Sequence, residues 1–360
     1  MKLSNLFFAG LLFSYSVLSY ANPPIERVKV AQGYKLSVYA TNVENARSLA
    51  LGKDGVVFVG SRSAGNVYAL LPDKNKDGKA DGVRVLAKNL NSPNGVAYRN
   101  GDLYIAEISQ LRRILKVDEK LDKETVPEVW GPSFPTETHH GWKYIAFGPD
   151  GWLYVPVGAP CNVCDKEPNL YAAIHRVSPD GKKRELVAKG VRNTVGFDWH
   201  PETKELWFTD NGRDWMGDTI PPCELNKVSK PQEHFGFPYC HGIISDPEFG
   251  KNVVCTQKYT TPLHEFPAHS APLGMKFVKQ PKGILVAEHG SWNRTDPVGY
   301  QVTLIDLSGP KPKSTAFLSG FLRGSSAWGR PVDVLELPDG SILISDDKAD
   351  AVYRVTKEQS

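Results

Sequence analysis

The amino-acid sequence predicts an all-β protein, a six-bladed β-propeller closed by an N-terminal strand. One unit occurs six times: a short apolar strand, a turn rich in Gly, Asp, Asn or Pro, and a second strand of alternating pattern. Helical periodicity is almost absent from the chain. Before the first unit, residues 35–40 (KLSVYA) form a strand pattern without a hairpin of its own. Radially stacked antiparallel sheets account for all three observations.

Each unit has the same form as "YIAFGPDGWLYVPVG", in which two strands flank the turn Gly148–Gly151, and a further strand-like run follows. The units begin at Ser48, Gly95, Tyr144, Gly196, Gly274 and Val334. We expect residues 35–40 to pair with residues 351–356 and so to close the ring. The long interval at about 215–270 is expected to be a loop excursion. A pair of β-sandwiches is the alternative architecture.

The first residues have the pattern of a secretory signal. Met1 and Lys2 precede the apolar run "LFFAGLLFSYSVL", and Ser19 and Ala21 place small residues at a cleavage site. We predict cleavage after Ala21, which leaves residues 22–360 as one domain in the periplasm or outside the cell. The apolar run is short for a membrane span, and no later run is longer.

The charge balance argues against nucleic acid as the main partner. The chain has 43 Lys and Arg against 40 Asp and Glu, a formal net charge of +3. Removing Lys2 leaves the balance nearly neutral, and no basic run occurs.

The five cysteines suit an exported protein. Cys161 and Cys164 form a CxxC pair followed by Asp165, whereas covalent haem attachment requires histidine at that position. A zinc site would need a second cysteine pair at similar spacing, and the sequence has none. We predict a local Cys161–Cys164 disulfide, a second disulfide between Cys240 and Cys255, and a free Cys223.

A separate metal motif lies early in the chain, in "DKNKDGKAD". Asp73, Asn75, Asp77 and Asp81 surround a glycine in the DxNxDG pattern of an EF-hand-like loop. The bidentate Glu at position twelve of such loops is missing, and Asp81 is the candidate to replace it. The pattern predicts a structural calcium ion; an exposed polar turn between two strands is the alternative.

Two histidines and a lysine stand where the chain enters the third unit, in "ETHHGWKYIAFGPDGWLYVPVG". In a propeller the loops that enter the inner strands gather on one face around the axis. His139, His140 and Lys143 are therefore predicted to lie at this face.

Several loop motifs together resemble a known family. These are "HHGWKYIAFGPDGWLYVPVG", "VRNTVGFDWHP", "LWFTDNGRDWMGD", "ELN", "HFGFP", "SAPLGM" and "GRPVDVLELPDGSILISDD". In this order they resemble the soluble aldose (glucose/sorbosone-type) dehydrogenases, and most nearly the sorbosone dehydrogenase-like branch, over about residues 33–355. The resemblance implies oxidation of the anomeric hydroxyl of an aldose, or of a sorbosone-like aldehyde, by hydride transfer to pyrroloquinoline quinone (PQQ) polarised by calcium.

The resemblance also implies roles for particular residues. The catalytic base of the family is a histidine four residues before a basic residue, which selects His139 ahead of Lys143; His140 is the alternative base or a substrate contact. Arg192 and Asn193 match the pair that holds the quinone. The backbone carbonyls of the residues matching the calcium loop are those of Gly212 and Arg213.

The cofactor's carboxylates and the sugar require further groups. Arg330 matches the first arginine of the family's Arg-x-Arg-Asp motif, but Val332 stands in place of the second. Arg294 and Lys143 are the candidates to replace it. His269 is a candidate substrate contact, and because "HEFPAHSAPLGM" lacks the aromatic pattern of glucose-type members, the sugar cannot be inferred from them. Without a haem motif, electrons must pass to a separate acceptor, either a quinone or a cytochrome.

Two other functions fit a six-bladed propeller. A calcium-dependent lactonase would need acidic side chains on several axial loops, where this sequence offers histidine, arginine and backbone. A non-enzymatic binding propeller would need neither His139 nor the Arg192-Asn193 pair. The sequence thus favours the sugar dehydrogenase.

Overall fold

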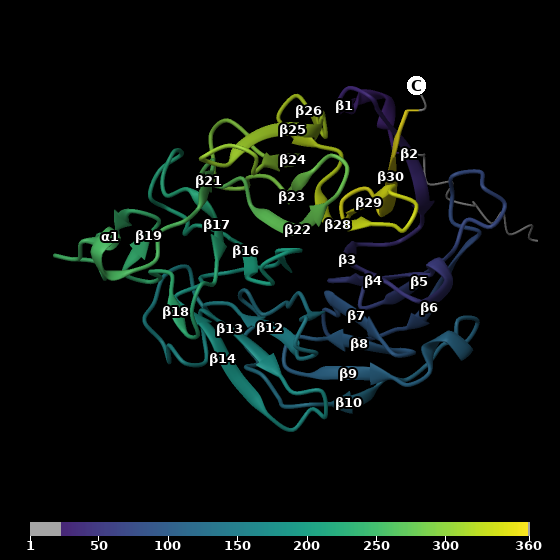
Figure 1. Cartoon of the computed structure of the whole chain (residues 1–360), viewed down its shortest axis with the longest axis horizontal. Helices are drawn as coiled ribbons and strands as arrows, with labels where there is room; N and C mark the ends of the chain where they lie inside the picture. Colours follow the sequence, from purple (N-terminus) through teal and green to yellow (C-terminus); the bar gives the residue numbers. More distant parts are fainter. Residues whose placement is uncertain (1–22, 359–360) are drawn as a thin grey trace, which may run out of the picture.

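A computed structural model describes residues 23–358 of the chain, and in this part the predicted fold is confirmed (Figure 1). Six antiparallel sheets surround a common axis, each beginning with its innermost strand. The first three blades consist of β3 (Ala46–Leu51), β4 (Val57–Ser61), β5 (Val67–Leu71) and β6 (Gly82–Ala87); β7 (Gly95–Arg99), β8 (Asp102–Ala106), β9 (Leu111–Ile114) and β10 (Glu128–Trp130); and β11 (Ala146–Phe147), β12 (Leu153–Val157), β13 (Ala173–Val177) and β14 (Arg184–Lys189).

The last three blades follow the same order. They consist of β15 (Phe197–Trp199), β16 (Leu206–Asp210), β17 (Cys223–Lys227) and β21 (His264–Phe266); β22 (Pro272–Val278), β23 (Gly283–Glu288), β24 (Gln301–Asp306) and β25 (Lys313–Ser319); and β28 (Pro331–Glu336), β29 (Ile342–Asp346), β30 (Ala351–Lys357) and β2 (Tyr34–Thr41). The remaining short elements are η1 (Ile25–Arg27), β1 (Lys29–Val30), η2 (Lys53–Gly55), η3 (Val117–Glu119), β18 (Glu233–His234), β19 (Cys240–His241), β20 (Ile244–Ser245), α1 (Cys255–Lys258), β26 (Leu322–Arg323) and β27 (Ser326–Ala327).

The N-terminal strand closes the ring as predicted. Strand β2 pairs antiparallel with β30, so that Lys35 lies opposite Thr356 and Ala40 opposite Val352. The strand thus supplies the outermost position of the last blade from the other end of the chain. Just before it, β1 pairs with β25 and adds an edge strand to the fifth blade, an element that the sequence pattern did not reveal.

Apolar side chains fill the spaces between neighbouring blades. The cluster between blades three and four, for example, contains Tyr144, Tyr154, Phe197 and Phe208, with the Tyr144 and Phe197 rings meeting edge to face at 4.8 Å. Polar bonds also cross between blades near the axis: the Asp333 carboxylate accepts from the backbone N–H of Leu49 at 2.8 Å. The ring is therefore packed on every side of the axis.

The interval at 215–270 is only partly the predicted excursion. Cys223 begins the regular strand β17, and β21 completes the fourth blade, so two blade strands lie inside the interval. The excursion proper lies between them and carries β18, β19, β20 and α1 (Figure 1). The predicted cysteine chemistry is confirmed: Cys161–Cys164 and Cys240–Cys255 are disulfides, and Cys223 is free and buried.

The predicted calcium loop follows β5 and lies away from the face that the inner strands enter. Leu71 pairs with Gly82 and Val57 with Leu70, so the loop shares its end of the blade with the β3–β4 turn. Asp73 accepts from the backbone N–H groups of Asp77 and Gly78 and forms an ion pair of 2.8 Å with Arg354.

In residues 23–358 no group of three or more His, Cys, Asp or Glu side chains is arranged to hold a metal ion. The predicted convergence of Asp73, Asn75, Asp77 and Asp81 on one ion is therefore not found. Asn75 and Asp77 instead accept backbone N–H groups within the loop, and Asp81 accepts that of Lys74 at 3.2 Å.

The predicted signal segment, residues 1–21, lies outside the described residues. Across residues 23–358 no helix has the length and apolar character required to span a bilayer. The longest α-helix of that range is a single turn, Cys255–Lys258.

Candidate active site

A cavity of about 270 Å³ lies at the axis, on the face where the chain enters the inner strands. Basic and aromatic side chains dominate its wall, and Asp214 is its single acidic residue. The lining residues are Arg47, Arg62, His140, Trp142, Arg192, Asn193, Asn211, Gly212, Asp214, Cys223, His269, Ala271, Leu273, His289, Gly290, Trp292 and Arg330. A wall with four guanidinium groups and one carboxylate favours an anionic ligand.

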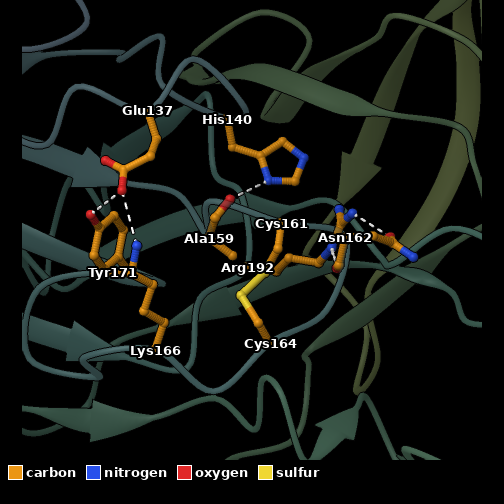
Figure 2. The surroundings of a disulfide bond; sticks show 9 residues. All are labelled: Glu137, His140, Ala159, Cys161, Asn162, Cys164, Lys166, Tyr171 and Arg192. Carbon is orange, nitrogen blue, oxygen red and sulfur yellow. Dashed lines mark hydrogen bonds and ion pairs between the residues drawn. A yellow bond between two sulfur atoms is a disulfide. The ribbon is translucent and has the colours of Figure 1, made fainter.

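His140 presents one ring nitrogen to this cavity in a defined tautomer. Its Nδ1 lies 2.8 Å from the carbonyl oxygen of Ala159, and the second ring nitrogen points away from that carbonyl (Figure 2). A carbonyl can only accept, so Nδ1 carries the proton and Nε2 has the lone pair. Burial, then the nearby Arg192, lowers the pKa of His140 well below its usual value. The ring is therefore a neutral proton acceptor.

The backbone at His140 is strained, and its packing is close. Its φ of 51° is left-handed, which is uncommon for residues other than glycine. The backbone of Gly158 passes directly against it, and a Cβ added there would lie 2.6 Å from the His140 Cβ. Such strain is maintained by the surrounding structure and is typical of functional positions.

His139 does not line the cavity and is exposed. Its ring packs against that of His140, with the ring centres 4.0 Å apart. Burial of part of the ring, then Arg192, lowers its pKa. The geometry thus reverses the predicted order of the two histidines and places His140, the alternative of the sequence analysis, at the cavity.

Lys143 supports the site from behind. Its Nζ donates to the backbone carbonyls of Ile108 and Gly141, and burial lowers its pKa to about 7. It does not reach the cavity, so it does not supply the missing cofactor contact. Because Gly141 follows His140 directly, Lys143 instead fixes the loop that holds the histidine.

Lys143 also belongs to a chain of polar residues around the axis. Arg47 Nε donates to Asn94 Oδ1 at 2.7 Å, and Asn94 Nδ2 donates to the backbone carbonyl of Lys143 at 2.8 Å. These three residues stand immediately before the first, second and third sequence units. That shared position is the sequence signal from which Arg47 could have been found.

Arg192 is fixed by the loop between the two cysteines of the first disulfide. Its Nε donates to the carbonyl of Asn162 and its Nη2 to Asn162 Oδ1, both at 2.9 Å (Figure 2). Its Nη1 donates to the carbonyls of Asn211 and Gly212. Of the five N–H groups of a guanidinium, one is left for a ligand. Arg192 therefore mainly holds the loops of the cavity wall in place, and it has one N–H left to bind a ligand.

Asn193 lines the cavity beside Arg192. The backbone N–H groups of both residues donate to the carboxylate of Asp210, at 2.7 and 2.8 Å. One buried carboxylate thus holds the predicted Arg-Asn pair in place. The pair is therefore rigid before any ligand binds.

The other arginines of the wall differ in how many donors they have free. Arg330 donates to the carbonyls of His289 and Gly290. The side chain of Arg62 makes no hydrogen bond within residues 23–358, and its guanidinium lies 3.8 Å over the ring of Trp142. Arg62, which the sequence analysis missed, thus has all its side-chain donors available. Arg294 donates to the carbonyl of Ala268 and does not line the cavity.

The residues predicted to bind calcium are only partly in place. Gly212 lines the cavity, but its carbonyl accepts Nη1 of Arg192 at 2.9 Å. The side chain of Arg213 turns away to an ion pair with the buried Asp246. A cation at the Gly212 carbonyl would adjoin a guanidinium, which opposes its binding.

His269 reaches the cavity as predicted and is tied to a neighbouring loop, since its Nε2 donates to the carbonyl of Gly217 at 2.8 Å. The cavity wall also contains three residues that were not predicted from the sequence, Asp214, His289 and Trp292. All three stand inside loop motifs, Asp214 in "DNGRDW" and the other two in "EHGSWNR". Polar residues that follow a blade's second strand were the available signal.

Comparison with protein families gives two matches along the chain. The Domain of unknown function (DUF7133) matches residues 24–235, more than half of the chain, and TrAA12-like matches residues 178–321. An uncharacterized protein of Borreliella burgdorferi is 35% identical over 355 residues, covering 92% of this chain and 91% of its own.

Solved structures show the same fold at low identity. The PQQ domain of pyranose dehydrogenase from Coprinopsis cinerea matches with a TM-score of 0.77 at 17% identity, covering 91% of this chain and 97% of that one. A family AA12 carbohydrate-active enzyme of Trichoderma reesei gives 0.79 at 18%, covering 92% and 97%.

The PQQ-bound aldose sugar dehydrogenase of Streptomyces coelicolor gives a TM-score of 0.64 at 20% identity, covering 91% of this chain and 99% of that one. These likenesses confirm the propeller fold that the resemblance of the loop motifs implied. The chain belongs to the DUF7133 family and has the propeller fold of the soluble PQQ-dependent sugar dehydrogenases.

Proposed function

We propose that this protein is a PQQ-dependent dehydrogenase that oxidises the anomeric hydroxyl of aldose sugars. The observation that carries the proposal is a neutral His140, with Nε2 free, in a cavity whose wall carries four guanidinium groups. A proton acceptor and a strongly cationic wall are what base-assisted transfer of a hydride to an anionic quinone requires. The fold of the neighbouring structures supports the same conclusion.

The residues present fit a tricyclic quinone with three carboxylates. Arg62 is a guanidinium whose side chain has no acceptor of its own, and Arg330 lines the same cavity from the neighbouring sixth blade. Arg192 keeps one N–H for a quinone oxygen, and Arg47 adds charge although it is paired with Asp347 at 2.8 Å. A cavity of about 270 Å³ lies just below the usual range of small-molecule sites, about 300–1,000 Å³, and suits one flat molecule. When bound, PQQ supplies the two-electron acceptor.

The role of His140 is to remove the proton of the sugar hydroxyl. Oxidation of the sugar breaks the C–H bond of the anomeric carbon and the O–H bond of its hydroxyl and yields the lactone; PQQ, when bound, would supply the hydride acceptor, and Nε2 of His140 would take the proton. The Ala159 carbonyl holds the ring and stabilises the imidazolium formed, because Nδ1–H remains its donor. His139 lies behind this ring, and we assign it no proton transfer.

Calcium is not part of this mechanism. The Gly212 carbonyl is engaged with Arg192, and Asp214 is the only acidic side chain of the cavity wall. These groups do not fit a divalent cation. A calcium-dependent lactonase would need several acidic side chains around the axis, and this cavity wall has only Asp214.

Two further parts of the proposal concern the surroundings of the enzyme. Oxidised CxxC and Cys240–Cys255 pairs agree with an exported protein, periplasmic or secreted. The two electrons must then leave the reduced cofactor for a separate acceptor, a quinone or a cytochrome, since the sequence has no haem-attachment motif.

The test is reconstitution of the purified protein. PQQ is added with and without calcium, its binding is followed by its absorbance, and reduction of a dye is measured with a panel of aldoses. We expect saturable binding, sugar-dependent dye reduction, and loss of turnover in His140→Ala with binding retained. Failure to bind PQQ under either condition, or dye reduction that is independent of sugar, would reject the proposal.

A further inference from the structure

Two tryptophans stand exposed at the mouth of the cavity. Trp215 and Trp292 are each 68% exposed, and their rings meet edge to face with centres 5.6 Å apart. Trp292 lines the cavity, and Trp215 directly follows the lining residue Asp214. Large aromatic side chains are seldom left in water together, and such a surface beside a pocket indicates a ligand contact.

The surrounding loops hold this pair in place. Trp215 has a φ of 68°, a left-handed conformation that is a true outlier for a bulky residue. The backbone N–H of Thr295, on the Trp292 loop, donates to Asp218 at 3.2 Å, and His269 donates to the carbonyl of Gly217. Two loops from different blades are thus tied together, and both indoles point outward. The left-handed backbone at Trp215 costs free energy, and burial of the exposed indole does not compensate for that cost.

A carboxylate with unused acceptor capacity lies beside the indoles. Asp214 is 18% exposed, and the nearest basic nitrogens, Nη2 of Arg192 and Nδ1 of His269, are both 3.6 Å away. That distance exceeds a hydrogen bond, so both carboxylate oxygens can accept from a ligand. A sugar ring offers C–H groups to an aromatic face and hydroxyl donors to a carboxylate. The chemistry of the mouth therefore suits a saccharide.

We propose that Trp215, Trp292 and Asp214 form a second sugar subsite, and that the substrate is a reducing oligosaccharide. Its terminal ring reaches His140, and its next ring lies in the corner between the two perpendicular indoles. The inference rests on the proposed function for the identity of the reacting ring. The subsite itself stands on the mouth residues alone.

The test compares chain lengths on the PQQ-loaded protein. Binding of glucose, maltose, cellobiose and xylobiose is measured by titration calorimetry, and dye reduction is measured in parallel. At least one disaccharide should bind more tightly than glucose. Trp215→Ala and Trp292→Ala should each weaken that disaccharide about two- to tenfold, the range of one aromatic contact, and glucose less than twofold. Trp292→Phe should restore most of the loss.

The matched control is Ile243→Ala, which removes an exposed apolar side chain, 61% exposed, from the β19–β20 hairpin. It should change no sugar affinity. The inference is overturned if the tryptophan variants weaken glucose and disaccharides equally, if they change neither, or if they alter only the rate with a cytochrome acceptor, which would make the pair an electron-carrier contact.

The two proposals fail in different ways. Disaccharide binding that depends on the tryptophans, without any oxidation, retains the subsite and rejects the dehydrogenase. Oxidation of glucose without any effect of chain length or of the tryptophans retains the dehydrogenase and rejects the subsite. Asp214→Asn provides a third test, because it should weaken binding of the disaccharide while the melting temperature is unchanged.

Discussion

The two disulfides should differ in what they mainly support. Removing Cys240–Cys255 should lower the melting temperature more, and removing Cys161–Cys164 should weaken PQQ binding more. Cys161 and Cys164 are three residues apart, whereas Cys240 and Cys255 are 15 apart. The entropy of closing these loops in the unfolded chain gives about 2 kcal/mol for the first and about 3 kcal/mol for the second. For a chain of this length the entropy of unfolding is about 0.7 kcal/mol per kelvin, so the losses in melting temperature should be about 3 and 4 °C.

Cofactor affinity should show the reverse order. Asn162 lies inside the small Cys161–Cys164 loop and binds Arg192 through two bonds of 2.9 Å. Without the bridge, Arg192 must be ordered by the ligand, at about 0.5–1.5 kcal/mol for one long side chain. The dissociation constant for PQQ should therefore rise about two- to tenfold in Cys161→Ser/Cys164→Ser.

The assay is calorimetric melting together with PQQ titration on both double-serine variants. Cys240→Ser/Cys255→Ser should lose more melting temperature and change PQQ affinity less than twofold. Asn162→Ala should reproduce the affinity loss with the bridge intact. Equal affinity losses in both double variants, or none in Cys161→Ser/Cys164→Ser, would refute the view that this disulfide acts through Asn162.

Four further outcomes are expected. His140→Ala should lower kcat about 10²–10⁴-fold, whereas His139→Ala should keep most activity; the reverse result would restore the predicted register. Because the pKa of His140 lies well below its usual value and the neutral ring is active, kcat/KM should stay constant from pH 7.5 to 6.5 and fall only at lower pH, and a fall already above pH 6.5 would contradict this. Arg62→Gln should weaken PQQ binding about tenfold without unfolding, measured by absorbance titration. Asp73→Asn should lower stability by about 2 kcal/mol, because Arg354 loses one of its two carboxylate partners and keeps only Asp339, and a loss that disappears in EDTA would indicate a calcium site instead.

The sequence sufficed for the ring because the period-2 pattern and the turn residues act locally in each blade. The unpaired strand at 35–40 had one possible partner once six hairpins had been assigned, and β2 pairs there. β1 has two residues and no pattern, so its pairing with the fifth blade depends on tertiary contacts alone.

The site was harder to predict because side-chain direction decides it. His139 and His140 are neighbours, and only the left-handed backbone at His140 and the close approach of Gly158 select which one faces the cavity. Arg62 and Asp214 both follow the second strand of their blade, but that position does not tell which way their side chains point. The metal motif shows a related limit, because the pairing of Asp73 with Arg354, distant in sequence, could not be predicted from the motif.

The pairing of β2 with β30 also constrains how the protein can assemble. Ser37 bonds to the carbonyl of Arg354, which lies 317 residues later, so the last blade cannot be completed until almost the whole chain is available. Before that moment the hydrogen-bonding edge of β30 is exposed, and exposed edges recruit strands from other molecules. A copy that has lost residues 34–41 would keep that edge permanently. Such truncated copies should associate with one another through the open edge of β30. A short peptide of the sequence YKLSVYAT should compete for that edge and return them to monomers.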